Sequence, residues 1–175
     1  MNGKESLAAY LACNVLTWNK VLSTTGMEAI IFCGLQASGK TTYYAQHFVK
    51  THFRISLDLL HTRNKEHIFL QACLTTGQAF VVDNTNPAPE DRRRYIEQAK
   101  AFRFRMVGYF FHTLPAAAIQ RDARRAAKEQ IPVPGIYGTY KKLQPLKFNE
   151  GFDELFWVEI RESHFVVTSG EWQGE

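Results

Sequence analysis

One short stretch constrains the fold of this chain more than any other: FCGLQASGKTTYY, at residues 32–44. It has the spacing G-x-x-x-x-G-K-[ST], with an apolar strand pattern before it and a helical pattern after it. Gly34 permits a tight exit from the strand, and Gly39 lets backbone N–H groups close on phosphate oxygens. Lys40 is expected to reach the β- and γ-phosphates, and the Thr41 hydroxyl to ligate Mg²⁺. We therefore predict a nucleotide-binding loop formed by Gly34, Leu35, Gln36, Ala37, Ser38, Gly39, Lys40, Thr41 and Thr42.

The remainder of the chain alternates short apolar runs with helical periodicity. The pattern predicts strands at 29–33, 54–57, 79–83 and 105–111, and one or two closing strands in 154–160 and 164–169. It predicts helices at 39–51 and about 64–76, 88–101, 115–128 and 135–143. Strands that alternate with helices imply a parallel sheet with helices on both faces. The predicted fold is a three-layer α/β sandwich of the P-loop NTPase type, with a helical lid at about 115–135.

The segment before this pattern has a different character. Residues 5–22 carry apolar side chains at helical spacing, which predicts an amphipathic helix. We therefore divide the 175 residues into an accessory helix at 1–26 and one P-loop domain at 27–175. The three cysteines form no C-x-x-C pair and the six histidines have no ligand spacing, so neither a disulfide framework nor a zinc site is expected. No apolar run reaches the roughly 18–20 residues of a membrane helix, and we expect a cytoplasmic protein with no membrane partner.

Two aspartates follow predicted strands. In an open parallel sheet, ligands bind beyond the carboxyl ends of the strands, where Asp58 follows RISL and Asp83 ends AFVVD. A carboxylate at the first position could take the proton of an acceptor hydroxyl, and one at the second could hold Mg²⁺ with Thr41. The alternatives are a helix cap for Asp58 and an Asx-type turn with Asn84 for Asp83.

Two basic clusters lie further along the chain. The stretch IQRDARRAAKEQIP at 119–132 carries four basic residues at helical spacing, Arg121, Arg124, Arg125 and Lys128. Such a helix could close over the phosphates and stabilise charge in the transition state, with a solvated surface helix as the alternative. The second cluster, EDRRRYIEQAK at 90–100, also fits a surface helix, and at most two of its three consecutive arginines can face a cleft. A net charge of +4 and a pI near 9.0 are compatible with a polyanionic partner.

Several motifs occur together in an order that is specific to one family. GLQASGKTT, DNTNP followed by RRRYIEQAK, IPVPGIYGTYKK and EGFDE make the sequence resemble the P-loop polynucleotide 5′-hydroxyl kinases, from about residue 27 to 154. The resemblance implies ATP-dependent, Mg²⁺-dependent transfer of the γ-phosphoryl group to a 5′-hydroxyl end of DNA or RNA. It implies that Asp58 is the general base, that Lys40 and Thr41 hold the nucleotide and the magnesium, and that Asp83 lies near the metal. By the same resemblance Arg125 or Arg121 is the lid arginine, and the acceptor is bound by Asp58, Arg63, Asn84, Asn86 and Arg94.

The sequence departs from this family in the predicted acceptor pocket. Leu57 precedes the aspartate where known members have a basic residue, and His61 stands where an arginine follows it in the phage-type pattern. Both changes remove positive charge, so a P-loop kinase of a small hydroxyl metabolite, such as a sugar, nucleoside or antibiotic, is the second hypothesis. A nucleotide-binding module without transfer activity is the third. No D-x-D-G-T or K-x-D-G motif is present, so a phosphatase or ligase activity would come from a separate protein.

Overall fold

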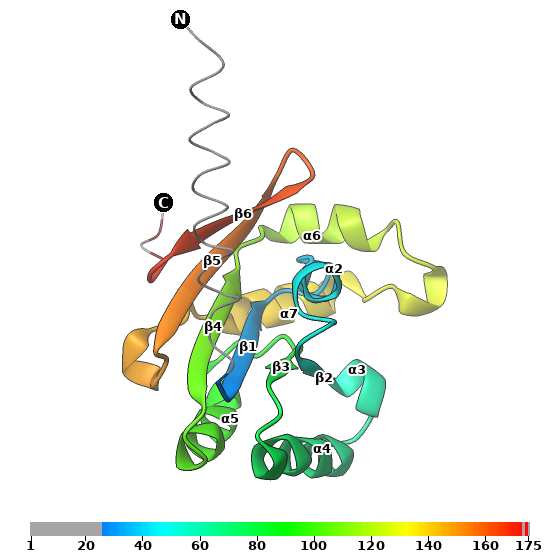
Figure 1. The fold of residues 1–175 in the computed structure, drawn as a ribbon. Coiled ribbons are helices and arrows are strands. Elements are labelled where there is room, and N and C mark those ends of the chain that lie inside the picture. The colour runs from blue at the N-terminus through cyan, green and yellow to red at the C-terminus, as the bar shows by residue number, and fades with distance from the viewer. Residues whose placement is uncertain (1–25, 173, 175) are drawn as a thin grey trace, which may run out of the picture.

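The computed structural model describes residues 26–172 and residue 174, so the helix predicted at 5–22 lies outside the described residues. A six-stranded sheet forms the centre, in the order β2-β3-β1-β4-β5-β6 (Figure 1). The strands are β1 (Glu28–Gly34), β2 (Phe53–Ile55), β3 (Phe80–Val82), β4 (Arg105–Phe111), β5 (Glu154–Arg161) and β6 (His164–Ser169). Strands β1 to β5 pair in parallel, which confirms the predicted sheet.

The last strand departs from the parallel pattern. Strand β6 pairs antiparallel with β5, with Ile160 opposite Phe165. Only Glu162 and Ser163 connect the two strands, and both have positive φ, 48° and 65°. Two such residues form a tight hairpin turn, whereas a parallel crossover needs a dozen or more residues. The two closing segments are therefore a β-hairpin at the edge of the sheet.

Helices cover both faces of the sheet. The elements are α2 (Lys40–His47), α3 (Leu57–Leu60), α4 (Arg63–Thr76), α5 (Pro89–Ala101), α6 (Pro115–Asp122) and α7 (Val133–Lys142), with 3-10 turns at Ala127–Glu129 and Phe148–Glu150. Strand β1 sends Ile30 and Phe32 into a core cluster with α2, and Ala29 and Ile31 into a second cluster with α4 and α5. Because neighbouring residues of one strand point to opposite faces, these two clusters lie on opposite sides of the sheet. The sheet and the helices on its two faces are the predicted three layers.

A third, small cluster attaches the lid to the phosphate loop. Leu35 of the loop packs against Ala118 of α6 and Ile136 of α7, all three fully buried. The helix predicted at 115–128 was too long, because α6 ends at Asp122. The buried carboxylate of Asp122 accepts a hydrogen bond from the backbone N–H of Ile131 at 2.7 Å, which turns the chain back toward α7.

Arg92, the first residue of the three-arginine run, is fully buried. Its Nε and Nη2 atoms donate to the two carboxylate oxygens of Glu150 at 2.7 and 2.8 Å. Its Nη1 atom donates to the backbone oxygens of Asn86, Pro87 and Gln144 at 3.0–3.2 Å. The guanidinium thus joins the loop after β3 to the segment after α7, so a surface helix was the wrong interpretation for this residue.

Loss of Arg92 is expected to destabilise the whole domain. Arg92→Met removes a fully buried guanidinium and leaves the half-buried Glu150 carboxylate without it, and removal of one member of a buried pair costs about 3–5 kcal/mol. Urea unfolding of the full chain measures this loss as a lower midpoint with an unchanged slope. Arg93→Met is the matched control, because Arg93 is exposed on the same helix. A loss for Arg92→Met no greater than that of the control would contradict the structural role.

Candidate functional site

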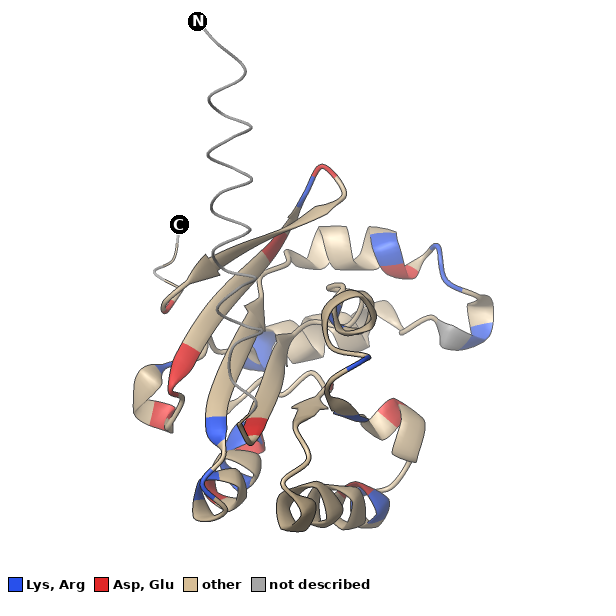
Figure 2. Ribbon diagram, in the orientation of Figure 1, with Lys and Arg blue, Asp and Glu red and all other residues tan. Residues whose placement is uncertain are grey.

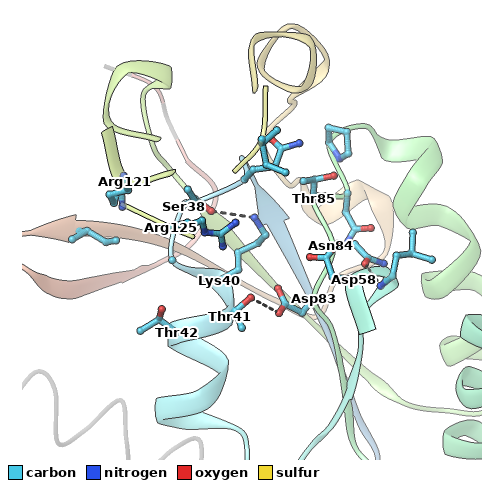
Figure 3. A pocket seen from close by; sticks show the side chains of 18 of the residues that line it. Ser38, Lys40, Thr41, Thr42, Asp58, Asp83, Asn84, Thr85, Arg121 and Arg125 are labelled. Carbon is cyan, nitrogen blue, oxygen red and sulfur yellow. Dashed lines mark hydrogen bonds between the residues drawn. The ribbon is translucent and has the colours of Figure 1, made fainter. Parts of the chain in front are cut away.

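A cavity of about 730 Å³ lies at the carboxyl ends of the parallel strands. Its lining includes the phosphate loop at 36–42, the segments after β2 and β3, the lid and the β5–β6 hairpin (Figure 3). Figure 2 shows the basic residues of the lid gathered at the end of α6 and in the loop that follows. The cavity therefore brings together the loop, both predicted aspartates and the basic helix end.

The two glycines of the phosphate loop have conformations that other residues adopt poorly. Gly39 has φ +94° directly before α2. Gly34 has φ +153°, and a Cβ atom there would lie 2.8 Å from the backbone oxygen of Phe111. The backbone N–H of Gly34 donates to the oxygen of Thr85 at 3.0 Å, which ties the loop to the segment after β3. The loop has the tight strand exit and helix start predicted for a phosphate-binding loop.

The Lys40 side chain lies on the floor of the cavity. Its Nζ atom donates to the backbone oxygen of Gly34 at 3.0 Å, to Ser38 Oγ at 3.2 Å and to the backbone oxygen of Leu35. Burial lowers the pKa of Lys40 to about 8, and the nearby Asp83 carboxylate opposes this shift. The ammonium group of Lys40 is thus held by oxygens of the loop. A bound phosphate chain could draw the group away from these oxygens.

Nucleotide binding is expected to raise the pKa of Lys40 again, because a nearby phosphate favours the charged ammonium. In the protein without nucleotide the pKa of Lys40 is about 8, so above that pH the protein must take up a proton when the nucleotide binds. At about pH 9 the uptake should approach one proton, and below about pH 6.5 it should vanish because both states are protonated. Calorimetry in two buffers with different ionisation enthalpies measures the uptake. Lys40→Arg is the control, since arginine stays charged, and equal uptake by both proteins would contradict the assignment.

Thr41 and Asp83 present two oxygen ligands side by side. Thr41 Oγ1 donates to Asp83 Oδ2 at 2.9 Å, and Asp83 is buried (Figure 3). Hard oxygen donors of this kind suit Mg²⁺, which takes one or two protein ligands and completes its shell with water and phosphate oxygens. The residues therefore fit the predicted ion. Within the described residues no cluster of three or more His, Cys, Asp or Glu side chains could hold another metal.

Arg54 of β2 shares this pair of ligands. Its Nε atom donates to Asp83 Oδ2 at 2.8 Å, and its Nη2 atom lies 2.7 Å from the same oxygen and 3.2 Å from Thr41 Oγ1. The guanidinium thus neutralises the Asp83 carboxylate and holds it against Thr41. The sequence reasoning missed this residue, because only the pairing of β2 with β3 brings Arg54 beside Asp83.

Asp58 follows β2, as predicted, and lines the cavity from the first turn of α3, but the strand ends at Ile55 and not at the predicted residue 57. The cause is Asn84, whose Oδ1 atom accepts the backbone N–H of Leu57 at 2.8 Å and ends the strand pairing. The Nδ2 atom of Asn84 donates to Glu66 at 2.8 Å, and Glu66 is buried and also accepts from Tyr95 at 2.8 Å. This network holds the start of α3, and with it the position of Asp58.

The other predicted acceptor residues have different surroundings. Arg63 lines the cavity and donates to Glu66 at 2.8 Å. Asn86 also lines it, but its amide donates to the backbone oxygen of Phe32 at 2.8 Å. Arg94 is absent from the cavity lining given by the described residues; it lies over the ring of Tyr95 and donates to the hydroxyl of that residue at 2.8 Å.

Both predicted lid arginines line the cavity although only Arg121 lies in the helix. Arg121 donates through Nε to the backbone oxygen of Ala117 at 3.1 Å and through Nη2 to Thr113 Oγ1 at 3.4 Å. Its Nη1 atom is buried and has no hydrogen-bond partner among the described residues, and burial lowers the pKa of Arg121. Arg125 is more exposed and lies 3.6 Å from Asp122. Lys142, which sequence reasoning did not select, also lines the cavity.

The sequence of this chain is similar to those of known proteins. A family model described as an AAA domain matches residues 30–135. The bifunctional polynucleotide phosphatase/kinase of Schizosaccharomyces pombe is 32% identical over 141 residues, which are 79% of this chain and 32% of that protein. The chain thus spans about a third of the length of this relative.

Among the described residues, no helix has the length and apolar character to cross a membrane.

Solved structures with similar folds include three P-loop neighbours of low sequence identity. A gluconokinase from Sinorhizobium meliloti has a TM-score of 0.55 at 17% identity, covering 77% of this chain and 83% of its own. Kti12 of Chaetomium thermophilum, in complex with ADP-AlF3, has a TM-score of 0.57 at 17% identity, covering 77% and 92%. The PezAT toxin-antitoxin system of Streptococcus pneumoniae has a TM-score of 0.57 at 14% identity, covering 95% of this chain and 82% of its own. These likenesses confirm the predicted fold, and because the family model covers more than half of the chain, this protein belongs to the AAA domain family of P-loop proteins.

Proposed function

We propose that this protein transfers the γ-phosphoryl group of ATP, with Mg²⁺, to a 5′-hydroxyl end of DNA or RNA. The observation that carries the proposal is the position of Asp58, whose carboxylate lines the same cavity as the phosphate loop and the lid arginines. A nucleotide-binding module without transfer would need no carboxylate at this end of the cavity. The identity with the phosphatase/kinase relative supports a polynucleotide acceptor.

In the proposed reaction each residue has one task. Lys40 leaves the loop oxygens and binds the β- and γ-phosphate oxygens. Thr41 and Asp83 would hold Mg²⁺, which neutralises charge on those oxygens when bound. Asp58 takes the proton from the acceptor hydroxyl, whose oxygen forms the new bond to the γ-phosphorus while the bond to the leaving ADP oxygen breaks. Arg121 stabilises the charge that develops on the transferred group.

A small hydroxyl metabolite is the second candidate acceptor, and one observation favours it. Leu57 lines the cavity next to Asp58. It places an apolar side chain where the polynucleotide 5′-hydroxyl kinases that the sequence resembles have a basic residue. Two cations, Arg63 and Lys142, nevertheless line the same cavity, whereas His61 is an exposed residue that ends α3. Arg63 is paired with Glu66, so Lys142 is the side chain that favours a nucleic acid acceptor, whose backbone phosphates are anionic.

The test is incubation of the full chain with γ-labelled ATP, Mg²⁺ and either 5′-hydroxyl DNA and RNA oligonucleotides or a panel of sugars and nucleosides. We expect label on an oligonucleotide, with activity that falls steeply as salt rises, because a phosphate backbone releases counterions when it binds. Oligonucleotides that already carry a 5′-phosphate are the matched control and should stay unlabelled. Label on a sugar or nucleoside alone, insensitive to salt, would overturn the proposal in favour of the second candidate.

A further inference from the structure

The β5–β6 hairpin reaches the cavity at a place that the proposed transfer does not use. Ile160 and Phe165 are opposite each other in the hairpin, and both line the cavity. A Cβ atom on Gly39 would lie 3.0 Å from Ile160 Cδ1 and 3.0 Å from Phe165 Cε1. The hairpin therefore lies directly against the phosphate loop, one residue before Lys40.

The cavity has two ends, and the phosphate loop lies between them. Figure 3 shows Asp58 and Asn84 on one side of Lys40 and Thr42 on the other, while Arg121 and Arg125 come from the lid side of the cavity. A γ-phosphate must face the acceptor and its base, so it belongs at the Asp58 end. A nucleotide bound in this direction has its ribose and base at the opposite end, where the cavity is lined by Thr42, Gln46 and the hairpin.

The side chains at this end have the chemistry that a nucleoside needs. Ile160 and Phe165 are half-buried apolar groups, and Tyr43 supports the Phe165 ring edge-on, with centroids 5.1 Å apart at 78°. Three neutral polar side chains surround them, Thr42, Gln46 and Ser163. Nucleobases stack on aromatic and apolar surfaces, and hydroxyl and amide groups can donate to or accept from a base edge or a ribose.

We propose that the β5–β6 hairpin binds the nucleobase and ribose of the donor nucleotide, with Ile160 and Phe165 as the contact surface. This inference rests on the proposed use of ATP as donor. Binding at the hairpin gives affinity for the nucleoside, whereas the loop and Lys40 bind the triphosphate. The two contributions are separable, because inorganic triphosphate binds the loop and Lys40 but lacks the nucleoside that the hairpin would contact.

The experiment compares Mg-ATP with magnesium triphosphate by calorimetry on the full chain. The wild-type protein should bind ATP more tightly than triphosphate. Phe165→Ala and Ile160→Ala should each weaken ATP about tenfold, within the range measured for loss of a base-stacking side chain, and leave triphosphate affinity within about twofold. Val167→Ala is the matched control, since Val167 lies in the same strand and packs on the core without lining the cavity.

Three results would overturn the hairpin site. Equal affinity of the wild-type protein for ATP and triphosphate would mean that no nucleoside site exists. Equal loss of both ligands in Phe165→Ala and Ile160→Ala would mean that the hairpin only supports the phosphate loop. Unchanged ATP affinity in both variants would place the base elsewhere. A failure of the proposed function is different, because ATP would then bind while no oligonucleotide becomes labelled.

Discussion

Replacement of Arg121 by alanine is expected to lower the rate of phosphoryl transfer by about 10³–10⁵-fold, the range for an arginine that stabilises a transferring phosphoryl group. The reason lies in its hydrogen bonds. Nε and Nη2 are held by Ala117 and Thr113, while Nη1 is buried and no described residue accepts its hydrogen bond. A buried donor without a partner carries a desolvation cost, which a phosphate oxygen in the cavity would remove.

Arg125→Ala should have a smaller effect, because its side chain is more exposed and lies near Asp122. Arg124→Ala is the control, an exposed neighbour that is not among the described residues that line the cavity. Single-turnover rates with saturating ATP separate transfer from binding, and thermal unfolding shows whether the variants stay folded. Near wild-type transfer by Arg121→Ala, with a large loss in Arg125→Ala, would exchange the roles of the two residues.

The sequence predicts best those features that depend on a few neighbouring residues. The phosphate loop is one, because the glycine conformations and the following helix follow from residues 34–41 alone. The order of strands and helices is another, since apolar periodicity is a local signal. The predicted helix at 115–128 failed because its end depends on a contact between Asp122 and Ile131, which periodicity does not record.

Features that depend on distant pairing were not predictable. The run at Arg92, Arg93 and Arg94 gives no sign of which arginine is buried, since the answer depends on Glu150, 58 positions away from Arg92. The place of Arg54 depends on the pairing of β2 with β3. The residue types next to Arg92 and Arg54 in the sequence do not indicate either contact.

The position of Asp58 combines both kinds of feature. The motif places an acid after the second strand, but the network of Asn84, Glu66 and Tyr95 decides that the chain enters a helix at Leu57. The start of α3, which carries Asp58, is therefore held by Asn84 and by the buried Glu66 carboxylate. Asn84 also lines the cavity, so its contact with the acceptor stays a prediction, and its bond to the backbone of Leu57 holds α3 in place.

Asp58→Asn is the sharpest single test of this arrangement. Asparagine keeps the shape of the side chain but cannot accept the proton of the acceptor hydroxyl, so we expect the transfer rate to fall by about 10²–10⁴-fold. The affinity for Mg-ATP should not weaken, because the phosphate loop and the Thr41–Asp83 pair are unchanged. Asp91→Asn is the matched control: Asp91 also lines the cavity, and its carboxylate accepts the backbone N–H of Ala88, a bond that asparagine preserves. Equal activity of Asp58→Asn and Asp91→Asn on the oligonucleotide would show that Asp58 is not the base, and the acceptor proton would then have to leave through water.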